Sequence, residues 1–186
     1  MPGHRIVLSA DRSLMTEFRG EAFFGFLTCA PKEYVPEIFY DKLFAPPVPK
    51  NGIEAEYAQY SLRKVEATLS TEFDPKVVHP SCIEQAVGED TEIVGITVMD
   101  PLGIGPVTSS FSFSEDVTPF NNRKLRKFLE KLPEGNYRLV VGGSGAWQFR
   151  DEESRRKYGI DHVLLGEFEK EGLDAFKKLW RVKHPK

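Results

Sequence analysis

Short runs of apolar residues recur along this chain and give the clearest signal in its hydrophobic pattern. They lie at residues 5–10, 92–99, 137–141 and 162–165, with a shorter run at 76–79. Their apolar residues are nearly continuous, which is typical of strands buried on both faces of a parallel sheet. We therefore expect five parallel strands, with 76–79 close to an edge of the sheet.

Segments with helical periodicity separate the predicted strands. One of them repeats apolar residues along a single helix face: Ala58, Leu62, Val65 and Leu69. Four further ranges are predicted to be helical: 81–87, 121–132, 147–158 and 168–180. An asparagine, Asn121 or Asn122, is expected to cap the second of these four helices.

Strands that alternate with helices predict βαβ units joined by right-handed crossovers. The expected fold class is therefore α/β, a Rossmann-like (flavodoxin-like) doubly wound domain with a mainly parallel five-stranded sheet. A long insert follows the first strand at residues 11–56 and is rich in aromatic residues and proline. Connections of this length usually carry function. We expect one domain over residues 1–186, with a short helix at 36–44 inside the insert.

The composition narrows the class of protein. The chain has 186 residues, 40% of them hydrophobic, so it can bury a core without a disulfide or a metal. The net charge of −3 argues against a general nucleic-acid binder. No apolar run approaches the roughly 20 residues of a membrane helix. No secretory signal is recognised at the N-terminus, so we expect a cytoplasmic location.

Cysteine and histidine are too sparse to predict a metal centre. Cys29 and Cys82 cannot supply the thiolates of a Cys-rich zinc site or an iron–sulfur cluster. The four histidines are scattered, without a His-x-x-x-His pair. We expect no metal site in this chain, a buried and inert Cys29, and a structural role for His79 unless it faces a binding cleft.

The carboxyl ends of parallel strands meet at one edge of a sheet, where ligands bind in doubly wound folds. Four loops follow predicted strands at that edge: 9–14, 100–106, 142–146 and 166–169. Gly142-Gly143-Ser144-Gly145 would let backbone N–H groups approach a phosphate or a ring carbonyl. A tight turn between a strand and a helix would need the same glycines. The segment matches neither a phosphate loop nor the Gly-x-Gly-x-x-Gly of nicotinamide-cofactor proteins.

The loop at 100–106 places a carboxylate and two glycines at the end of another predicted strand. Its prolines and glycines restrict the loop to one shape. A rigid structural loop is one interpretation of this pattern. Because Thr97 and Asp100 are also polar at the same edge, we favour a loop that faces a ligand.

Three pieces of the sequence together resemble a known domain. They are Val140-Val141-Gly142-Gly143, then Gly159-Ile160-Asp161, then Gly166-Glu167-Phe168-Glu169. In this order they are similar to the N-terminal cobalamin (vitamin B12)-binding domain of B12-dependent radical S-adenosylmethionine proteins. Val94-Gly95-Ile96-Thr97 matches that family's third strand, which usually ends in a small hydroxyl residue. The resemblance covers residues 1–10 and 57–180 and leaves the insert unexplained.

The resemblance implies that a corrin ring lies over the carboxyl edge of the sheet. It also implies that the nucleotide tail of the cobalamin enters a crevice beside the loop at 142–143. The implied cobalamin-binding residues are Asp11, Arg12, Ser13, Thr97, Met99, Asp100, Gly103, Gly142, Gly143, Ser144, Gly166 and Glu167. No catalytic residue is assigned in this chain.

The sequence departs from the family in two respects. The motif Asp-x-His-x-x-Gly is absent, so the first strand–helix loop offers no lower axial histidine, as is common in the radical branch. The three-cysteine motif of the iron–sulfur barrel is also absent. We infer a truncated N-terminal piece or a stand-alone binding domain, which is not catalytic alone. A C-terminal radical S-adenosylmethionine domain of the parent would hold a 4Fe-4S cluster and S-adenosylmethionine, and methylcobalamin would donate the methyl group.

Two alternative functions stay open at this point. The Phe-rich segment 18–44 and the Pro-rich stretch 46–49 favour a non-enzymatic flavodoxin-like interaction domain with a docking surface for a partner. The same fold also suits a flavin or nucleotide binder.

Overall fold

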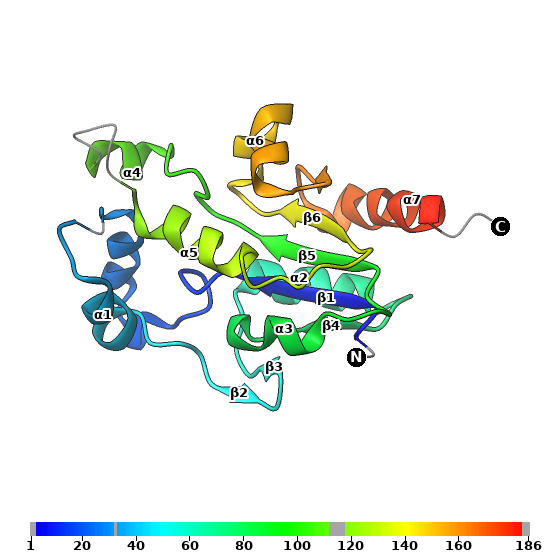
Figure 1. Cartoon of the computed structure of the whole chain (residues 1–186), viewed down its shortest axis with the longest axis horizontal. Coiled ribbons are helices and arrows are strands. Elements are labelled where there is room, and N and C mark those ends of the chain that lie inside the picture. The colour runs from blue at the N-terminus through cyan, green and yellow to red at the C-terminus, as the bar shows by residue number, and fades with distance from the viewer. Residues whose placement is uncertain (1–2, 32, 112–117, 184–186) are drawn as a thin grey trace.

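A parallel five-stranded sheet forms the centre of the molecule (Figure 1). The computed structural model describes residues 3–31, 33–111 and 118–183. The strands of the sheet are β1 (Ile6–Ala10), β4 (Pro75–Val77), β5 (Ile93–Thr97), β6 (Arg138–Gly142) and β7 (His162–Val163). Their spatial order is β4-β1-β5-β6-β7, the flavodoxin-like order. The predicted α/β doubly wound fold is confirmed, and β4 lies at the sheet edge as expected.

The pairing of β1 with β5 explains why the apolar runs in the sequence are continuous. The two strands run in register from Ile6↔Ile93 to Ala10↔Thr97, and β5 pairs with β6 on its other side. All five residues of β1 are buried. Successive side chains of a strand point to opposite faces, and helices cover both faces, so both sets are buried and nearly all of them are apolar; the exception in β1 is Ser9, whose hydroxyl donates to the Val78 carbonyl.

The helices divide between the two faces of the sheet (Figure 1). They are α1 (Glu37–Phe39), α2 (Tyr60–Leu69), α3 (Ile83–Ala86), α4 (Pro106–Phe111), α5 (Phe120–Leu129), α6 (Glu152–Tyr158) and α7 (Leu173–Lys183). Leu62 of α2 and Phe176 of α7 share one core cluster with Leu8 of β1. Ile83 of α3 and Phe128 of α5 belong to the cluster on the opposite face.

Shorter elements complete the chain. A hairpin is formed by β2 (Lys50–Asn51) and β3 (Glu54–Ala55). Turns of 3₁₀ helix lie at Phe18–Gly20, Ala22–Cys29, Pro80–Cys82 and Ala146–Phe149. Single π-helical turns lie at Tyr40–Phe44 and Phe168–Gly172. The short helix predicted at 36–44 is therefore present as α1 and the π-helical turn that continues it.

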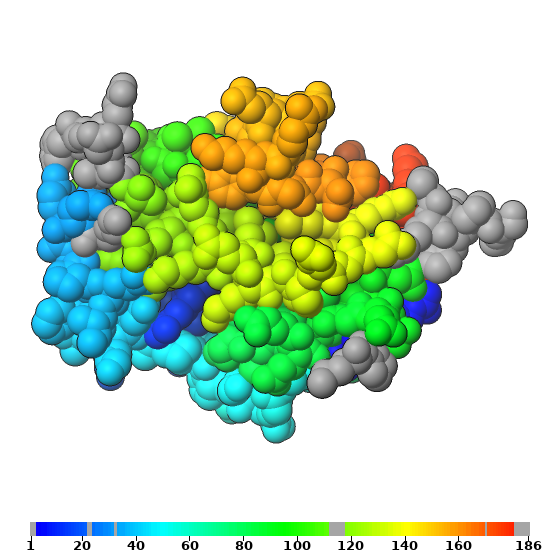
Figure 2. All heavy atoms as spheres, in the orientation of Figure 1, coloured from blue at the N-terminus to red at the C-terminus, as the bar shows by residue number. Residues whose placement is uncertain are grey.

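The insert packs against α5 and forms one end of the molecule (Figure 2). The rings of Tyr40 and Phe120 stack with centroids 4.2 Å apart. The buried ammonium of Lys124 donates to Glu37 Oε1 at 2.7 Å and to Asp41 Oδ1 at 2.6 Å. An aromatic stack and a buried ionic cluster thus join this part of the insert to α5.

The predicted cap of α5 is wrong. Pro119 occupies the N-cap position, and Asn121 and Asn122 are buried within the helix. Asn122 instead donates through Nδ2 to the Pro101 carbonyl and the Tyr158 hydroxyl, at 2.6 and 2.8 Å. Its amide serves a tertiary contact because the start of α5 lies under the loop that follows β5. Within the described ranges, no helix combines the length and apolar character needed to cross a membrane.

Candidate functional site

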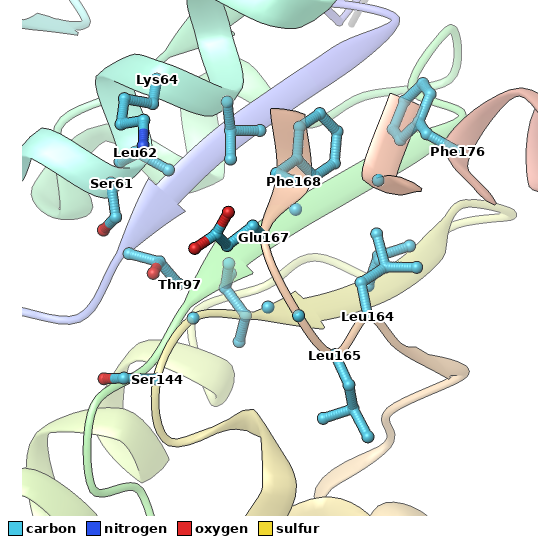
Figure 3. Close-up of a pocket in the computed structure, with 18 of the residues that line it drawn as sticks. Ser61, Leu62, Lys64, Thr97, Ser144, Leu164, Leu165, Glu167, Phe168 and Phe176 are labelled. Carbon is cyan, nitrogen blue, oxygen red and sulfur yellow. The ribbon is translucent and has the colours of Figure 1, made fainter. Parts of the chain in front are cut away.

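A cavity of about 470 Å³ lies against one face of the sheet and opens at the carboxyl ends of the strands. The wall on one side is α2, and the wall on the other is the segment from Leu164 to Phe176 (Figure 3). Pockets for small ligands typically measure about 300–1,000 Å³, so this cavity is large enough to hold one.

Two glycines, which carry no side chain, form part of the floor of the cavity. Gly95 of β5 and Gly142 of β6 both line it. A Cβ atom added at Gly142 would have only the Leu164 carbonyl oxygen near it, at 3.9 Å. A larger side chain at Gly142 would therefore extend into the cavity. Glycine inside a strand often marks a place where another group approaches the backbone closely.

Gly143 forms the turn that carries the chain out of β6 at the mouth of the cavity. Its φ is +99°, which disfavours any residue with a side chain. An added Cβ would lie 2.5 Å from both Thr97 Oγ1 and the Val98 carbonyl oxygen. This turn needs glycine for structural reasons, and it also brings Ser144 and Thr97 to the same rim.

Polar side chains gather at the mouth of the cavity. Thr97, Ser144 and Glu167 all line it, and the Glu167 carboxylate is directed inward toward Thr97 (Figure 3). Lys64 of α2 forms an ion pair with Glu169, which joins the two walls. The hydrogen bond to Glu169 raises the pKa of Lys64 above its usual range.

The interior of the cavity is apolar. Leu8, Leu62, Leu69 and Phe176 line its deeper part and are all buried. A polar mouth above an apolar interior suits a ligand that buries a flat, weakly polar group and leaves a hydrophilic part outside. Among the residues that the structure describes, no group of three or more His, Cys, Asp or Glu is placed to hold a metal ion.

The neighbouring position along the same edge, between β1 and β5, is filled by the chain itself. This is the switch point in strand order, where doubly wound folds usually bind ligands. Only about 20 Å³ is left between Asp11, Asn121 and their neighbours. Asp11 Oδ1 accepts from the backbone N–H and the hydroxyl of Ser13, at 2.7 and 2.6 Å. Burial raises the pKa of Asp11 to about 6.

The filled part of the edge around Asp11, Ser13 and Asp100 is called the closed region below. Arg12 links it to the rest of the insert. Its Nη2 donates to the Asp41 carbonyl at 2.7 Å, and its Nε lies 3.8 Å from Asp41 Oδ1. Asp41 and Glu37 also share the buried Lys124. Partial burial would raise the pKa of Glu37, but the hydrogen bonds from Lys124 and Lys127 lower it to about 2.

The loop after β5 is held by its own carboxylate. Asp100 Oδ1 accepts from the Gly105 N–H at 2.9 Å and from Gln148 Nε2 at 2.6 Å, and Oδ2 accepts from Thr108. Gly103 has a φ of +72°, and a Cβ added there would collide with Pro119. These contacts fit the rigid structural interpretation of the loop, although Met99 remains about half exposed at its start.

The structure separates the twelve predicted binding residues into three sets. Six of them line the large cavity: Thr97, Gly142, Gly143, Ser144, Gly166 and Glu167. Four lie around the small space at the switch point, namely Asp11, Ser13, Met99 and Asp100, whereas Arg12 and Gly103 line neither.

The motif at 159–161 has a structural role in this fold. Gly159 ends α6 in the left-handed conformation, and Ile160 is buried in the core. The Asp161 carboxylate accepts from the Leu139 N–H at 2.7 Å, while the Asp161 N–H donates to the Leu139 carbonyl at 3.0 Å. This motif therefore fixes how the chain enters β7 beside β6.

The sequence reasoning missed the wall of the cavity that α2 provides. Ser61, Leu62, Lys64 and Val65 line the site, but the helical periodicity marks their apolar members only as core. The available signal was Gly95, an isolated glycine inside an otherwise apolar β-branched run. Such a glycine indicates that another group approaches the backbone of β5 closely, and the cavity lies against this part of β5.

The fold and the cavity define the class of this protein as a doubly wound α/β domain with a ligand-sized cavity at the carboxyl edge of its sheet. No family model, curated protein or solved structure matches the chain.

Proposed function

We propose that this chain is a cobalamin-binding domain whose large cavity receives the nucleotide tail of the cofactor. The observation that carries the proposal is the position of the cavity. It opens beside Gly142 and Gly143, the glycines on which the resemblance to the B12-dependent family rests, and Gly166 and Glu167 of the same resemblance line its other side.

The residues present fit such a ligand. The apolar interior of about 470 Å³ suits an aromatic base, and the hydroxyls of Thr97 and Ser144 suit the polar sugar and phosphate at the mouth. Exposed apolar side chains at the same edge suit the face of a large ring: Trp147 and Leu165 line the cavity, and Met99 and Ile104 lie on the loop after β5. When bound, cobalamin would supply methyl-transfer chemistry, and this chain would bind and orient it.

In this proposal the parent is a radical S-adenosylmethionine enzyme of the methyltransferase type. A further domain of that parent would hold the 4Fe-4S cluster and S-adenosylmethionine, and no residue of this chain is assigned to either. The support for this part of the proposal is the order of the three sequence motifs.

The flavin alternative has weaker support from the geometry. Flavin in this fold type binds at the switch point between the first and third strands in chain order, which are β1 and β5 here. Asp11, Ser13 and Asp100 fill that position in this chain, and only about 20 Å³ is left.

The interaction-domain alternative has one observation in its favour. Five large apolar side chains of the insert are about half exposed: Phe26, Tyr34, Ile38, Phe39 and Leu43. Exposed apolar groups close together on one segment often mark partner sites. Concentration-dependent gel filtration of the chain, with Ile38→Glu as the matched variant, tests for self-association through this segment.

The test of cobalamin binding compares two ligands and two proteins. Wild type and Gly142→Leu are mixed with hydroxocobalamin or with cobinamide, the same corrin without the nucleotide tail, and retained corrin absorbance is measured after desalting. We expect wild type to retain hydroxocobalamin more tightly than cobinamide by about tenfold or more, the effect of one good buried group. Gly142→Leu should remove that difference and leave cobinamide binding unchanged.

Two results would overturn the proposal. One is the absence of retained corrin at high micromolar wild-type protein. The other is equal loss of both ligands in Gly142→Leu, which would place the tail outside the cavity. Circular dichroism of the variant establishes that it is folded.

A further inference from the structure

A second group of reactive side chains lies under the β2–β3 hairpin, away from the cavity. Lys50 Nζ of β2 donates to Cys82 Sγ at 3.0 Å. Cys82 begins the turn into α3 and is 1% exposed, whereas Lys50 and Ser81 beside it are exposed. The thiol therefore lies just below the surface, covered by the side chain of Lys50.

Among the residues that the structure describes, no carboxylate forms an ion pair with the Lys50 ammonium. The only polar partner recorded for its Nζ in that part of the chain is the sulfur of Cys82. A short contact from an ammonium to a sulfur is strongest when the sulfur is a thiolate.

The other contacts of Cys82 favour the same ionisation state. The acceptors that the described residues offer a neutral Cys82 thiol are distant, the Ser81 hydroxyl at 3.7 Å and the Gly52 carbonyl at 4.0 Å. Burial raises the pKa of the Cys82 thiol, but the hydrogen bonds from Lys50 and Ser81 and the charge of Lys50 outweigh it, and the net shift is downward. Burial and the nearby Lys50 also lower the pKa of His79, which disfavours a positive charge on its ring.

We propose that Cys82 and Lys50 form a peroxide-sensitive thiolate–amine pair that closes into a covalent sulfenamide cross-link. In the first step the Cys82 thiolate attacks hydrogen peroxide. An S–O bond forms, the O–O bond breaks, and the departing hydroxide takes a proton from the Lys50 ammonium to give water. The products are a sulfenic acid and a neutral amine in contact.

In the second step the amine nitrogen of Lys50 attacks the sulfenic sulfur. An S–N bond forms, the S–O bond breaks, and the departing hydroxide leaves as water with a proton from the nitrogen. Each cycle consumes one peroxide, releases two waters and oxidises the cysteine and lysine pair by two electrons. Excess thiol reverses the product, first by breaking the S–N bond to a mixed disulfide and then by freeing Cys82.

The cross-link would fix the hairpin of the insert to the start of α3. Residues 50 and 82 are 32 positions apart in sequence. A covalent bond between them restricts the unfolded chain, so the oxidised protein should unfold at a higher temperature than the reduced protein.

The experiment uses variants with one cysteine each. Cys29→Ala leaves Cys82, and Cys82→Ala leaves Cys29, which is partly buried and whose sulfur has the Thr28 hydroxyl, and no lysine, as its hydrogen-bond partner among the described residues. With hydrogen peroxide, the Cys82 protein should lose its free thiol about tenfold faster than the Cys29 protein, because the thiolate that Lys50 stabilises is the nucleophile and the neutral thiol is not. Its intact mass should fall by two hydrogens, and peptide mapping should join residues 50 and 82.

Two Lys50 variants in the Cys29→Ala background separate the two steps. Lys50→Arg keeps the charge and the hydrogen bond, so oxidation should stay fast and stop at a sulfenic acid that dimedone traps. Lys50→Gln removes the charge, so oxidation should slow by about tenfold.

Equal reactivity of Cys29 and Cys82 would overturn the thiolate assignment. A loss of two hydrogens in Lys50→Arg would overturn the role of the lysine nitrogen, because a backbone amide would then be the partner. Unchanged circular dichroism in each variant establishes that the fold is retained.

Discussion

Two neighbouring positions on the carboxyl edge of the sheet differ in what fills them. Between β1 and β5, Asp11, Ser13 and Asp100 close the edge, and Lys124 ties the adjoining insert to α5. Between β5 and β6, the glycine floor and the Gly143 turn leave a cavity of about 470 Å³. The first position is the usual ligand site of this strand order. A long insert after the first strand can therefore occupy that site and leave the next pair of strands as the open one.

The largest expected change in stability comes from a substitution of Lys124, the residue that holds the insert on α5. Its side chain is 4% exposed and contacts both Glu37 and Asp41. We expect Lys124→Met to lower the free energy of unfolding by about 3–5 kcal/mol, because two carboxylates lose their buried partner. Urea unfolding measures the change. Lys127→Met is the matched control, since the Lys127 side chain is 48% exposed, and it should cost less than about 1 kcal/mol. Equal effects of the two variants would contradict this description.

The ionisation of Asp11 should give the closed region a pH dependence. Burial raises the pKa of Asp11 from 3.8 to about 6, so the folded state binds the proton more tightly than the unfolded state. Its contribution to the free energy of unfolding is therefore greatest below pH 4, falls by about 3 kcal/mol as the pH rises to about 6, and is constant above.

Asp11→Asn isolates this contribution, because all other titrating groups are common to both proteins. The variant should exceed wild type in stability by up to about 3 kcal/mol at pH 7, and the difference should vanish near pH 4. Urea unfolding across this range measures it. A difference that does not change with pH would show that Asp11 is not responsible.

Two adjacent glycines beside the cavity, Gly142 and Gly143, should differ in how much an alanine substitution lowers stability. Gly143→Ala should lower the free energy of unfolding by about 2 kcal/mol, because a side chain is forced to positive φ against the backbone of Val98. Gly142→Ala should change it by less than about 0.5 kcal/mol, since its Cβ would meet no atom closer than 3.9 Å. Thermal unfolding distinguishes them, and the reverse order of effects would mean that the turn can adjust.

The smallest expected effect on stability comes from removing the ion pair between Lys64 and Glu169 at the mouth of the cavity. Lys64 is exposed at its charged end, so Lys64→Gln should leave the unfolding temperature unchanged. If the pair restrains the two walls, release of bound hydroxocobalamin should become a few-fold faster. Stopped-flow release against excess free cyanocobalamin measures it. Glu66→Gln is the control, because Glu66 pairs with Arg63 on the same helix and does not line the cavity.

The sheet was predictable from the sequence because strands buried on both sides leave continuous apolar runs. The position of the cavity was only partly predictable. The runs ending at Thr97 and Gly142 locate one rim, but the wall contributed by α2 has the same apolar spacing as an ordinary core helix. The closure at Asp11 was not predictable either, because Asp100 and Asn121, which line the same small space, lie more than 80 positions away in the sequence and approach Asp11 only in the folded chain.

The contact between Lys124 and the insert also bears on the order in which parts of the domain fold. The Lys124 contact with Glu37 spans 87 positions, so the insert leaves the ribosome well before its anchor on α5 has been synthesised. Until α5 follows, Glu37 and Asp41 lack their shared buried cation and Tyr40 lacks the ring on which it stacks. The insert is therefore expected to settle among the last parts of the domain, after the strands beside it have formed a surface to receive it.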